Sequence, residues 1–200
     1  MCENNLGKIS VITGPMFSEK SGELIKRILK MERYGGKKVK AYKPTEDFRF
    51  EADWIVSRMG YRYPASNIPR KLTDSIIEEI LVETESIDVV AFDEVQFFSK
   101  PIMGLVDELA YRGKHVICDG LNMDYREKEF GFMGGLLTMA DEITNLTSYC
   151  SVCQSPHARF TQRMVNGMPA KMGPIILIGD KEDYEVRCRS CYIPPHKVRN

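Results

Sequence analysis

Two kinds of hydrophobic pattern alternate along the first 148 residues. Short apolar or β-branched runs, with the length and composition of buried strands, occupy residues 8–13, 39–42, 87–92, 114–118 and 142–148. Between them, apolar residues recur at the spacing of an amphipathic helix in residues 21–34, 72–81, 99–110 and 136–140. Strands that alternate with helices indicate right-handed crossovers and a largely parallel sheet. The pattern therefore predicts an α/β fold.

Capping residues define the ends of three of these helices. The Gly35-Gly36 pair is suited to end the first, since glycine adopts the left-handed conformation at little cost. Thr73 or Asp74 can cap the second, and Pro101 suits the first turn of the third. The stretch 45–70 is polar, aromatic and interrupted by prolines, so we expect mostly loop there, with at most a short strand at 55–56.

The pattern changes after Tyr149. Residues 150–191 contain four cysteines in two pairs and only one short apolar run, which suggests a small separate module. We therefore predict an α/β core at 1–149, a zinc-binding module at 150–192 and a tail at 193–200. At roughly 150 residues per domain, a chain of 200 residues has room for one core and an appendage.

The overall charge narrows the classes of function. With 28 basic and 28 acidic residues the formal net charge is zero, which argues against a dedicated nucleic-acid binder because such domains are usually strongly basic. A small anionic ligand needs only a local positive patch. No apolar segment has the length of a signal-peptide core or of a membrane helix, so we expect a cytoplasmic protein with no membrane partner.

The segment 14–21, GPMFSEKS, lies between the first predicted strand and the first predicted helix. It resembles the phosphate-binding motif G-x-x-x-x-G-K-[ST], in which backbone N–H groups wrap the phosphates, the lysine reaches their β and γ oxygens and the hydroxyl binds Mg²⁺. Glu19 stands where the motif has its second glycine. The other interpretation is an ordinary connection between strand and helix that happens to contain Gly14 and Lys20.

Glu19 brings a negative charge to a site for negatively charged phosphates. At an effective dielectric of 20, a carboxylate about 4 Å from a phosphate charge costs on the order of 4 kcal/mol, or roughly a thousandfold in affinity. Either the side chain points to solvent and leaves the backbone cradle intact, or the loop binds nucleotide poorly. We expect the first, because the other motifs are unspoiled.

Two adjacent acids, Asp93 and Glu94, follow the most apolar predicted strand. Ligands of open parallel sheets bind beyond the carboxyl ends of the strands, and an aspartate at this position commonly serves the Mg²⁺ of a phosphate loop. The neighbouring glutamate can then act as general base toward a hydroxyl. Alternatively, Asp93 only caps the turn after the strand. Its pairing with Lys20 and Ser21 favours the catalytic interpretation.

Cys150 and Cys153 form one C-x-x-C pair, and Cys188 and Cys191 form a second. Four thiolates at this spacing suit a tetrahedral structural Zn²⁺, although two redox pairs or an iron–sulfur site would use the same residues. With all four ligands supplied by the protein, a zinc site is closed and structural. Cys118 falls on an apolar strand, where we expect it to be buried and inert.

In their order and spacing, these motifs resemble the thymidine kinase family of the human-cytosolic and bacterial type. The resemblance covers nearly all of residues 7–192 and rests on GPMFSEKS at 14–21, VSRMG at 56–60, FDEVQFF at 92–98, GLNMDYREKEFG at 120–131, LTSYCSVC at 146–153, FTQR at 160–163 and DYEVRCRSC at 183–191. It implies transfer of the γ-phosphoryl group of ATP, bound with Mg²⁺, to the 5′-hydroxyl of thymidine. It also implies a RecA-like P-loop core, a zinc-ribbon domain with a lasso loop over the nucleoside, a homotetramer, and feedback inhibition by thymidine triphosphate.

The resemblance also implies roles for individual residues. Glu94 would be the catalytic base, with Lys20 and Arg58 close to the transferred phosphate. ATP and Mg²⁺ would contact Gly14, Pro15, Met16, Phe17, Ser18, Glu19, Lys20, Ser21, Asp93, Glu94, Val95 and Gln96. The thymidine pocket would be formed by Met16, Phe97, Leu121, Tyr125 and Phe130 with the lasso residues Thr161, Ile175, Ile176, Leu177, Ile178, Gly179 and Tyr184. The family usually has phenylalanine at the position of Tyr125, so this edge of the pocket is expected to be more polar here, and it has glycine at the position of Glu19.

Two other functions stay open. A zinc-ribbon ATPase or nucleic-acid-binding protein with a RecA-like core would draw on the basic C-terminal residues, which are Arg187, Arg189, His196, Lys197 and Arg199. DNA binding with a steep salt dependence, and no nucleoside-dependent ATP turnover, would favour that function. A weakened paralogue that binds nucleotide as a sensor is suggested by Glu19.

Overall fold

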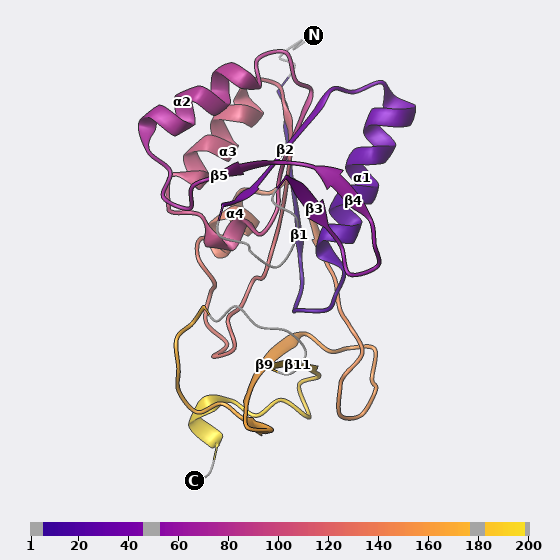
Figure 1. The fold of residues 1–200 in the computed structure, drawn as a ribbon, viewed down its shortest axis with the longest axis vertical. Coiled ribbons are helices and arrows are strands. Elements are labelled where there is room, and N and C mark those ends of the chain that lie inside the picture. Colours follow the sequence, from indigo (N-terminus) through magenta and orange to yellow (C-terminus); the bar gives the residue numbers. More distant parts are fainter. Residues whose placement is uncertain (1–5, 46–52, 177–182, 199–200) are drawn as a thin grey trace.

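The chain forms a mixed α/β structure around one parallel sheet, so the predicted fold class is confirmed. The computed structural model describes residues 6–45, 53–176 and 183–198. The six strands of the sheet are β1 (Lys8–Thr13), β2 (Val39–Pro44), β5 (Ser66–Ile68), β6 (Val89–Phe92), β7 (His115–Gly120) and β8 (Glu142–Asn145). Their order is β5-β2-β6-β7-β1-β8, and every neighbouring pair is parallel. The carboxyl ends of β1, β6 and β7 therefore lie side by side at one edge (Figure 1).

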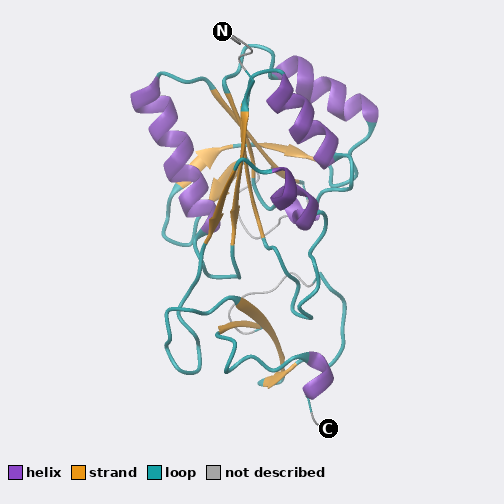
Figure 2. Ribbon diagram, turned by 180° about the vertical axis from the view of Figure 1, so that it is seen from behind, coloured by secondary structure: helices purple, strands orange, loops and turns teal. Residues whose placement is uncertain are grey.

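Helices cover both faces of this sheet, as Figures 1 and 2 show from opposite sides. One face carries α1 (Lys20–Gly35), and the other carries α2 (Asp74–Glu83), α3 (Ile102–Tyr111) and α4 (Met133–Met139). Within β6, Val89 and Ala91 belong to the core beneath α1, while Val90 and Phe92 belong to the core beneath the other three helices. Because this strand is buried on both sides, its sequence is an unbroken apolar run.

Most helix boundaries lie where the capping residues predict. Gly36 follows α1 with a left-handed backbone (φ 63°), and its N–H donates to Met31 O. The Thr73 hydroxyl caps α2 by accepting a hydrogen bond from the N–H of Ile76. The third helix, α3, begins at Ile102, three residues later than expected, and Pro101 is its N-cap and not part of its first turn.

The stretch 45–70, predicted as mostly loop, contains three short strands among its described residues. β3 (Trp54–Val56) and β4 (Arg62–Pro64) form an antiparallel hairpin, and β5 joins the edge of the parallel sheet beside β2. The hairpin buries Ile55 and Tyr63 in the core beneath α1. The prediction took the prolines as signs of a loop. Pro64 is instead the last residue of β4. β5 lies at the edge of its sheet, where strands tolerate proline.

Two elements near the end of the core differ in length from the prediction. α4 begins three residues before the expected start, because Met133 and Leu136 are fully buried and their packing outweighs the low helix propensity of the two glycines between them. β8 ends at Asn145 and not at Ser148, since its register with β1 stops at Thr13, where the phosphate-loop segment begins.

Beyond the carboxyl ends of the parallel strands lies a smaller antiparallel sheet (Figure 1). Its strands are β9 (Phe160–Val165), flanked by β10 (Met168–Pro169) and β11 (Tyr184–Arg187). Two short 3₁₀ helices complete the described elements, η1 (Val95–Phe97) after β6 and η2 (Pro195–Lys197) near the C-terminal end. The domain boundaries at 149 and 192 stay a prediction. Throughout the described ranges, each helix is too short or too polar to cross a bilayer.

Candidate active site and cysteine cluster

The phosphate-loop segment 14–19 curls tightly between β1 and α1. A Cβ atom added to Gly14 would lie 2.7 Å from Leu146 O, so only glycine fits this close approach. Pro15 O accepts two hydrogen bonds from within the segment, one from Ser18 Oγ (2.8 Å) and one from Lys20 Nζ (3.1 Å). The loop thus holds Lys20, a residue that is 8% exposed, at the start of α1.

Glu19 does not point to solvent, so that expectation is wrong. Its backbone is left-handed (φ 61°, ψ 37°) at the N-cap of α1, a conformation that costs a side chain roughly 1–2 kcal/mol and costs glycine almost nothing. Its carboxylate lies over the first turn, because a Cβ added to Gly22 would be only 2.7 Å from Glu19 Oε2. That oxygen is buried without a hydrogen-bond partner. Glu19 is also one of the residues that line the cleft described below.

Three carboxylates meet where β6 and β7 end. Ser21 Oγ donates to Asp93 Oδ1 (2.9 Å) and lies 3.4 Å from Asp119 Oδ2. Asp119 Oδ1 accepts a hydrogen bond from the backbone N–H of Glu94 (3.1 Å). Asp119 is fully buried, and burial together with the neighbouring Asp93 raises its pKa well above the ordinary value. Asp119 was not predicted from the sequence, although an acid at the end of an apolar strand is the signal that identified Asp93.

Glu94 is held from two sides. It follows Asp93 with a left-handed backbone (φ 50°), which the hydrogen bond to Asp119 supports. Gln96 Nε2 donates to Glu94 Oε2, and Gln96 Oε1 accepts from the N–H of Leu121 (3.1 Å). Gln96 thereby connects the loop after β6 to the loop after β7.

These loops surround one cleft of about 950 Å³, its open mouth included. Fifteen of the residues predicted for the site line it: Met16, Phe17, Glu19, Lys20, Ser21, Arg58, Glu94, Phe97, Leu121, Tyr125, Phe130, Thr161, Ile175, Ile176 and Tyr184. Those placed behind or beside it are Gly14, Pro15, Ser18, Asp93, Val95 and Gln96. The cleft is also lined by residues that were not predicted, namely Gly22, Val56, Ser57, Met123 and Asp124. Leu177, Ile178 and Gly179 lie outside the described residues.

Aromatic rings form one wall of the cleft. Phe97 and Phe130 meet edge to face, with ring centroids 5.5 Å apart, and the Arg70 guanidinium lies 4.8 Å from the Phe97 centroid. On the phosphate-loop side, the Arg58 guanidinium lies 4.6 Å from the Phe17 ring. The cleft therefore combines an apolar wall with cationic groups beside the phosphate loop, as a ligand with a planar base and phosphates requires.

The antiparallel sheet closes the cleft from the opposite side. Thr161 Oγ1 accepts a hydrogen bond from the N–H of Met16 (3.1 Å), and Ser148 Oγ donates to Phe17 O (2.9 Å). The Tyr125 hydroxyl donates to Gly173 O (3.1 Å). The structure turns the Tyr125 hydroxyl to the backbone of Gly173, and the greater polarity expected at this edge of the pocket stays a prediction.

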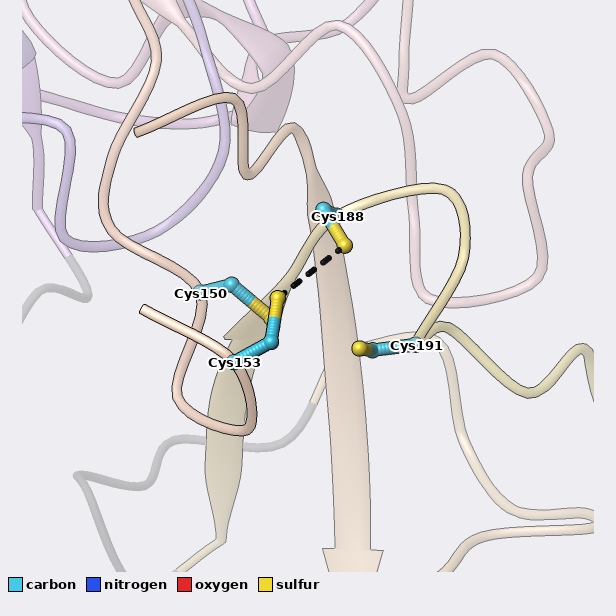
Figure 3. A group of neighbouring side chains, drawn as sticks. All are labelled: Cys150, Cys153, Cys188 and Cys191. Atoms are coloured by element: carbon cyan, nitrogen blue, oxygen red, sulfur yellow. Dashed lines mark hydrogen bonds between the residues drawn. The ribbon is translucent and has the colours of Figure 1, made fainter. Parts of the chain in front are cut away.

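The four cysteines predicted as metal ligands gather in one place, although 34 residues separate the two pairs (Figure 3). Their sulfurs all lie within 4.8 Å of one another, with Cys153 and Cys188 3.7 Å apart. Zinc bound at about 2.3 Å from each sulfur needs sulfur–sulfur distances near 3.8 Å, so the cluster fits this ion. Burial raises the pKa of Cys150, but backbone N–H groups, first that of Cys153, outweigh it and lower the pKa to about 6. Cys191 shifts in the opposite direction, since hydrogen bonds with the sulfurs of Cys153 and Cys188 raise its pKa to about 12. The fit to zinc therefore rests on the positions of the four sulfurs.

A comparison with protein families agrees with this arrangement. The model of the thymidine kinase family matches residues 7–192, which include every element of the parallel sheet, the cleft and the four cysteines.

Proposed function

The chain belongs to the thymidine kinase family, and we propose that it transfers the γ-phosphoryl group of ATP to the 5′-hydroxyl of thymidine, giving thymidine monophosphate. The family is one of phosphotransferases. One observation carries the proposal for this chain: a single cleft is lined by Lys20 and Ser21 of the phosphate loop, by Glu94 at the end of β6, and by an aromatic wall. Phosphoryl transfer asks mainly for positioning and charge neutralisation, which these groups supply.

The phosphates of ATP would lie at the start of α1. Lys20 now donates to a neutral carbonyl, Pro15 O, and a phosphate oxygen would give its ammonium a charged acceptor. Ser21 and Asp93, already joined by a hydrogen bond of 2.9 Å, would hold Mg²⁺, as hard oxygen ligands do. Bound Mg²⁺ supplies charge neutralisation at the transferred group. Arg58, beside Phe17 on the cleft wall, would add positive charge near the γ-phosphate.

The nucleoside would lie against the opposite part of the cleft. Phe97 and Phe130 present a rigid apolar corner to a planar base, and Ile175 and Ile176 line the cleft from the covering segment 173–176. Glu94 would then accept the proton of the 5′-hydroxyl. Its carboxylate is oriented by the Gln96 side chain and its backbone by Asp119, so it is held for that role before substrate arrives.

Other properties implied by the family resemblance are part of the same proposal. A structural zinc ion on the four cysteines would fix the segments that carry Thr161 and Tyr184. A cytoplasmic homotetramer inhibited by thymidine triphosphate fits a salvage enzyme for DNA synthesis. The zero net charge supports a nucleoside substrate over nucleic acid.

The test is ADP formation that depends on thymidine, measured with the wild type and with Glu94→Gln. A lost general base lowers the rate constant of chemistry by about 100- to 10,000-fold, so we expect kcat to fall by this much in the variant. Glu78→Gln, an exposed acid on α2, is the matched control and is expected to keep wild-type kcat. A Glu94→Gln enzyme with near-normal kcat would contradict the assignment of the base.

A second function is favoured by one observation, the buried Oε2 of Glu19, which has no hydrogen-bond partner and lies over the first turn of α1. It would suit a weakened relative that binds nucleotide without efficient turnover. ATP binding without thymidine-dependent ADP formation would support this function. ADP formation that needs no nucleoside, and rises with DNA, would instead favour the zinc-ribbon ATPase.

A further inference from the structure

Tyr125 is the centre of a small cluster that the proposed chemistry does not use. Its side chain is 2% exposed, and two guanidinium groups lie by its ring, Arg126 at 5.2 Å and Arg163 at 5.5 Å from the centroid. The hydroxyl accepts a hydrogen bond from Arg126 Nε (3.0 Å) and donates to Gly173 O (3.1 Å). Both hydrogen-bonding capacities of the phenol are therefore satisfied within the protein.

The same two arginines bind the covering segment 173–176 directly. Arg126 Nη2 donates to Gly173 O, and Arg163 Nη1 donates to Pro174 O (2.6 Å). Two successive carbonyls are thus held by charged donors, which make stronger hydrogen bonds than neutral ones. A Cβ atom added at Gly173 would lie 2.6 Å from Arg163 Nη1, so a larger residue here would push the guanidinium out of its present position.

The Tyr125 side of the cluster is itself fixed. The Tyr192 hydroxyl donates to Tyr125 O, and Asp124 Oδ1 accepts from the N–H groups of Arg126 and Lys128 (2.8 and 3.0 Å). The loop after β7 is therefore anchored on its own, and the covering segment is attached to it. Ile175 and Ile176, which follow the two held carbonyls, line the cleft.

We propose that the Tyr125 hydroxyl is a latch, a positioning group that fixes segment 173–176 against the loop after β7 and so sets how firmly the cleft holds a nucleoside. Phenylalanine at this position would keep the ring and its guanidinium contacts but would leave Gly173 O to Arg126 alone. The part of the inference that concerns the nucleoside rests on the proposed function. The part that concerns the segment does not.

The first measurement is trypsin cleavage after Lys171, an exposed residue two positions before the segment, in the free protein. Cleavage of a native chain requires local opening, and its rate follows the population of the open form. Removing one hydrogen bond from the latch should raise that population, so Tyr125→Phe is expected to be cut about 3- to 10-fold faster. Arg126→Ala, which removes an exposed side chain that donates to Gly173 O, should be cut faster as well. Tyr111→Phe, exposed at the end of α3, is the control and should match the wild type.

The second measurement is the KM for thymidine against the KM for ATP in the same variants. We expect the KM for thymidine to rise about 3- to 10-fold in Tyr125→Phe, with the KM for ATP unchanged, a split that general destabilisation would not produce. Unchanged cleavage in both Tyr125→Phe and Arg126→Ala would overturn the latch. Faster cleavage with an unchanged KM for thymidine would overturn its role in nucleoside binding. Faster cleavage in a protein without thymidine-dependent turnover would support the latch and contradict the proposed function.

Discussion

Glu19 is the residue where sequence, backbone and electrostatics conflict most. It occupies a left-handed position that favours glycine, and it carries a negative charge into a loop proposed to bind phosphates. The sequence was enough to identify the substitution. It could not show the direction of the side chain, because that depends on the close approach of the carboxylate to Gly22.

The charge and the backbone of Glu19 can be separated by two substitutions. Glu19→Gln removes only the charge, and Glu19→Gly also removes the backbone strain. We expect both to raise ATP affinity, by about 10- to 1,000-fold depending on the distance to the phosphates. Only Glu19→Gly should also raise the free energy of unfolding, by roughly 1–2 kcal/mol. Calorimetric titration with Mg²⁺ and ATP, and urea unfolding, measure the two effects. Equal ATP affinity in all three proteins would show that the carboxylate does not face the phosphates.

Of the three acidic residues at the ends of β6 and β7, two were predicted as site residues and one was missed. Asp93 and Glu94 stood out because a strongly apolar strand precedes them, and the structure places Ser21 against Asp93. Asp119, near the end of β7, was not singled out, although a comparable apolar run precedes it. Its relation to Asp93 becomes visible only once β6 and β7 are known to be neighbours in the sheet.

At the scale of elements, periodicity identified every helix of the core and five of the six parallel strands. The exception, β5, and the hairpin β3–β4 have three residues each. Segments this short have too few positions for a period to be recognised. Their strand conformation is stabilised by tertiary contacts, such as the burial of Ile55 and Tyr63 beneath α1. The strands β9 and β11 are longer but were also missed, since they pair with each other across a long intervening segment. β10 has only two residues.

The junction of β1, β7 and β8 should make stability depend on pH. His115 of β7 lies opposite Lys8 of β1, and its Nε2 is 2.9 Å from Ser10 Oγ. Burial, and then Lys8, lower the pKa of His115 below its ordinary value of 6.5, partly opposed by Glu142 and Asp141. The unfolded chain therefore binds a proton at a higher pH than the folded one, and the free energy of unfolding should fall as the pH drops below about 6.5.

Urea unfolding at a series of pH values tests this junction. His115→Gln keeps a hydrogen-bonding side chain but does not titrate, so the decrease in unfolding free energy between pH 7 and 5 should be smaller than in the wild type. His196→Gln, an exposed histidine on η2, should leave the decrease unchanged. Identical pH profiles for the wild type and His115→Gln would contradict the shift.

The cysteine cluster packs against both the antiparallel sheet and the phosphate loop. Cys150 and Cys188 are buried beside Val186 of β11, and Phe17 of the phosphate loop packs against them. Removal of zinc by dialysis against a strong chelator should therefore loosen β9 and β11 and abolish thymidine-dependent turnover, because Thr161 and Tyr184 lose their positions. The purified protein should contain about one zinc ion per chain, and Zn²⁺ but not Mg²⁺ should restore activity. Protein without bound metal but with full activity would refute the site.

At the scale of the whole molecule, the cleft exists only where the parallel sheet and the C-terminal module meet. The sequence indicated both parts that form the cleft. The loops at the ends of the predicted strands pointed to the first part, and the cysteine pairs pointed to the second. It could not show that Thr161 accepts a hydrogen bond from Met16, or that Ser148 binds Phe17. Nor could it show the hydrogen bond from Tyr125 to Gly173 O. These contacts join segments separated by more than 40 residues, and local patterns carry no information about them.

The most direct test follows the labelled γ-phosphoryl group of ATP. With Mg²⁺ present, label should appear in thymidine monophosphate when thymidine is supplied, and none should be transferred when 5′-deoxythymidine, which lacks the accepting hydroxyl, replaces it. This result would support a single reaction in which the phosphate loop, Glu94 and the aromatic wall act together on ATP and thymidine. Label released as free phosphate at equal rates with both nucleosides, and absent from thymidine monophosphate, would contradict the proposed function.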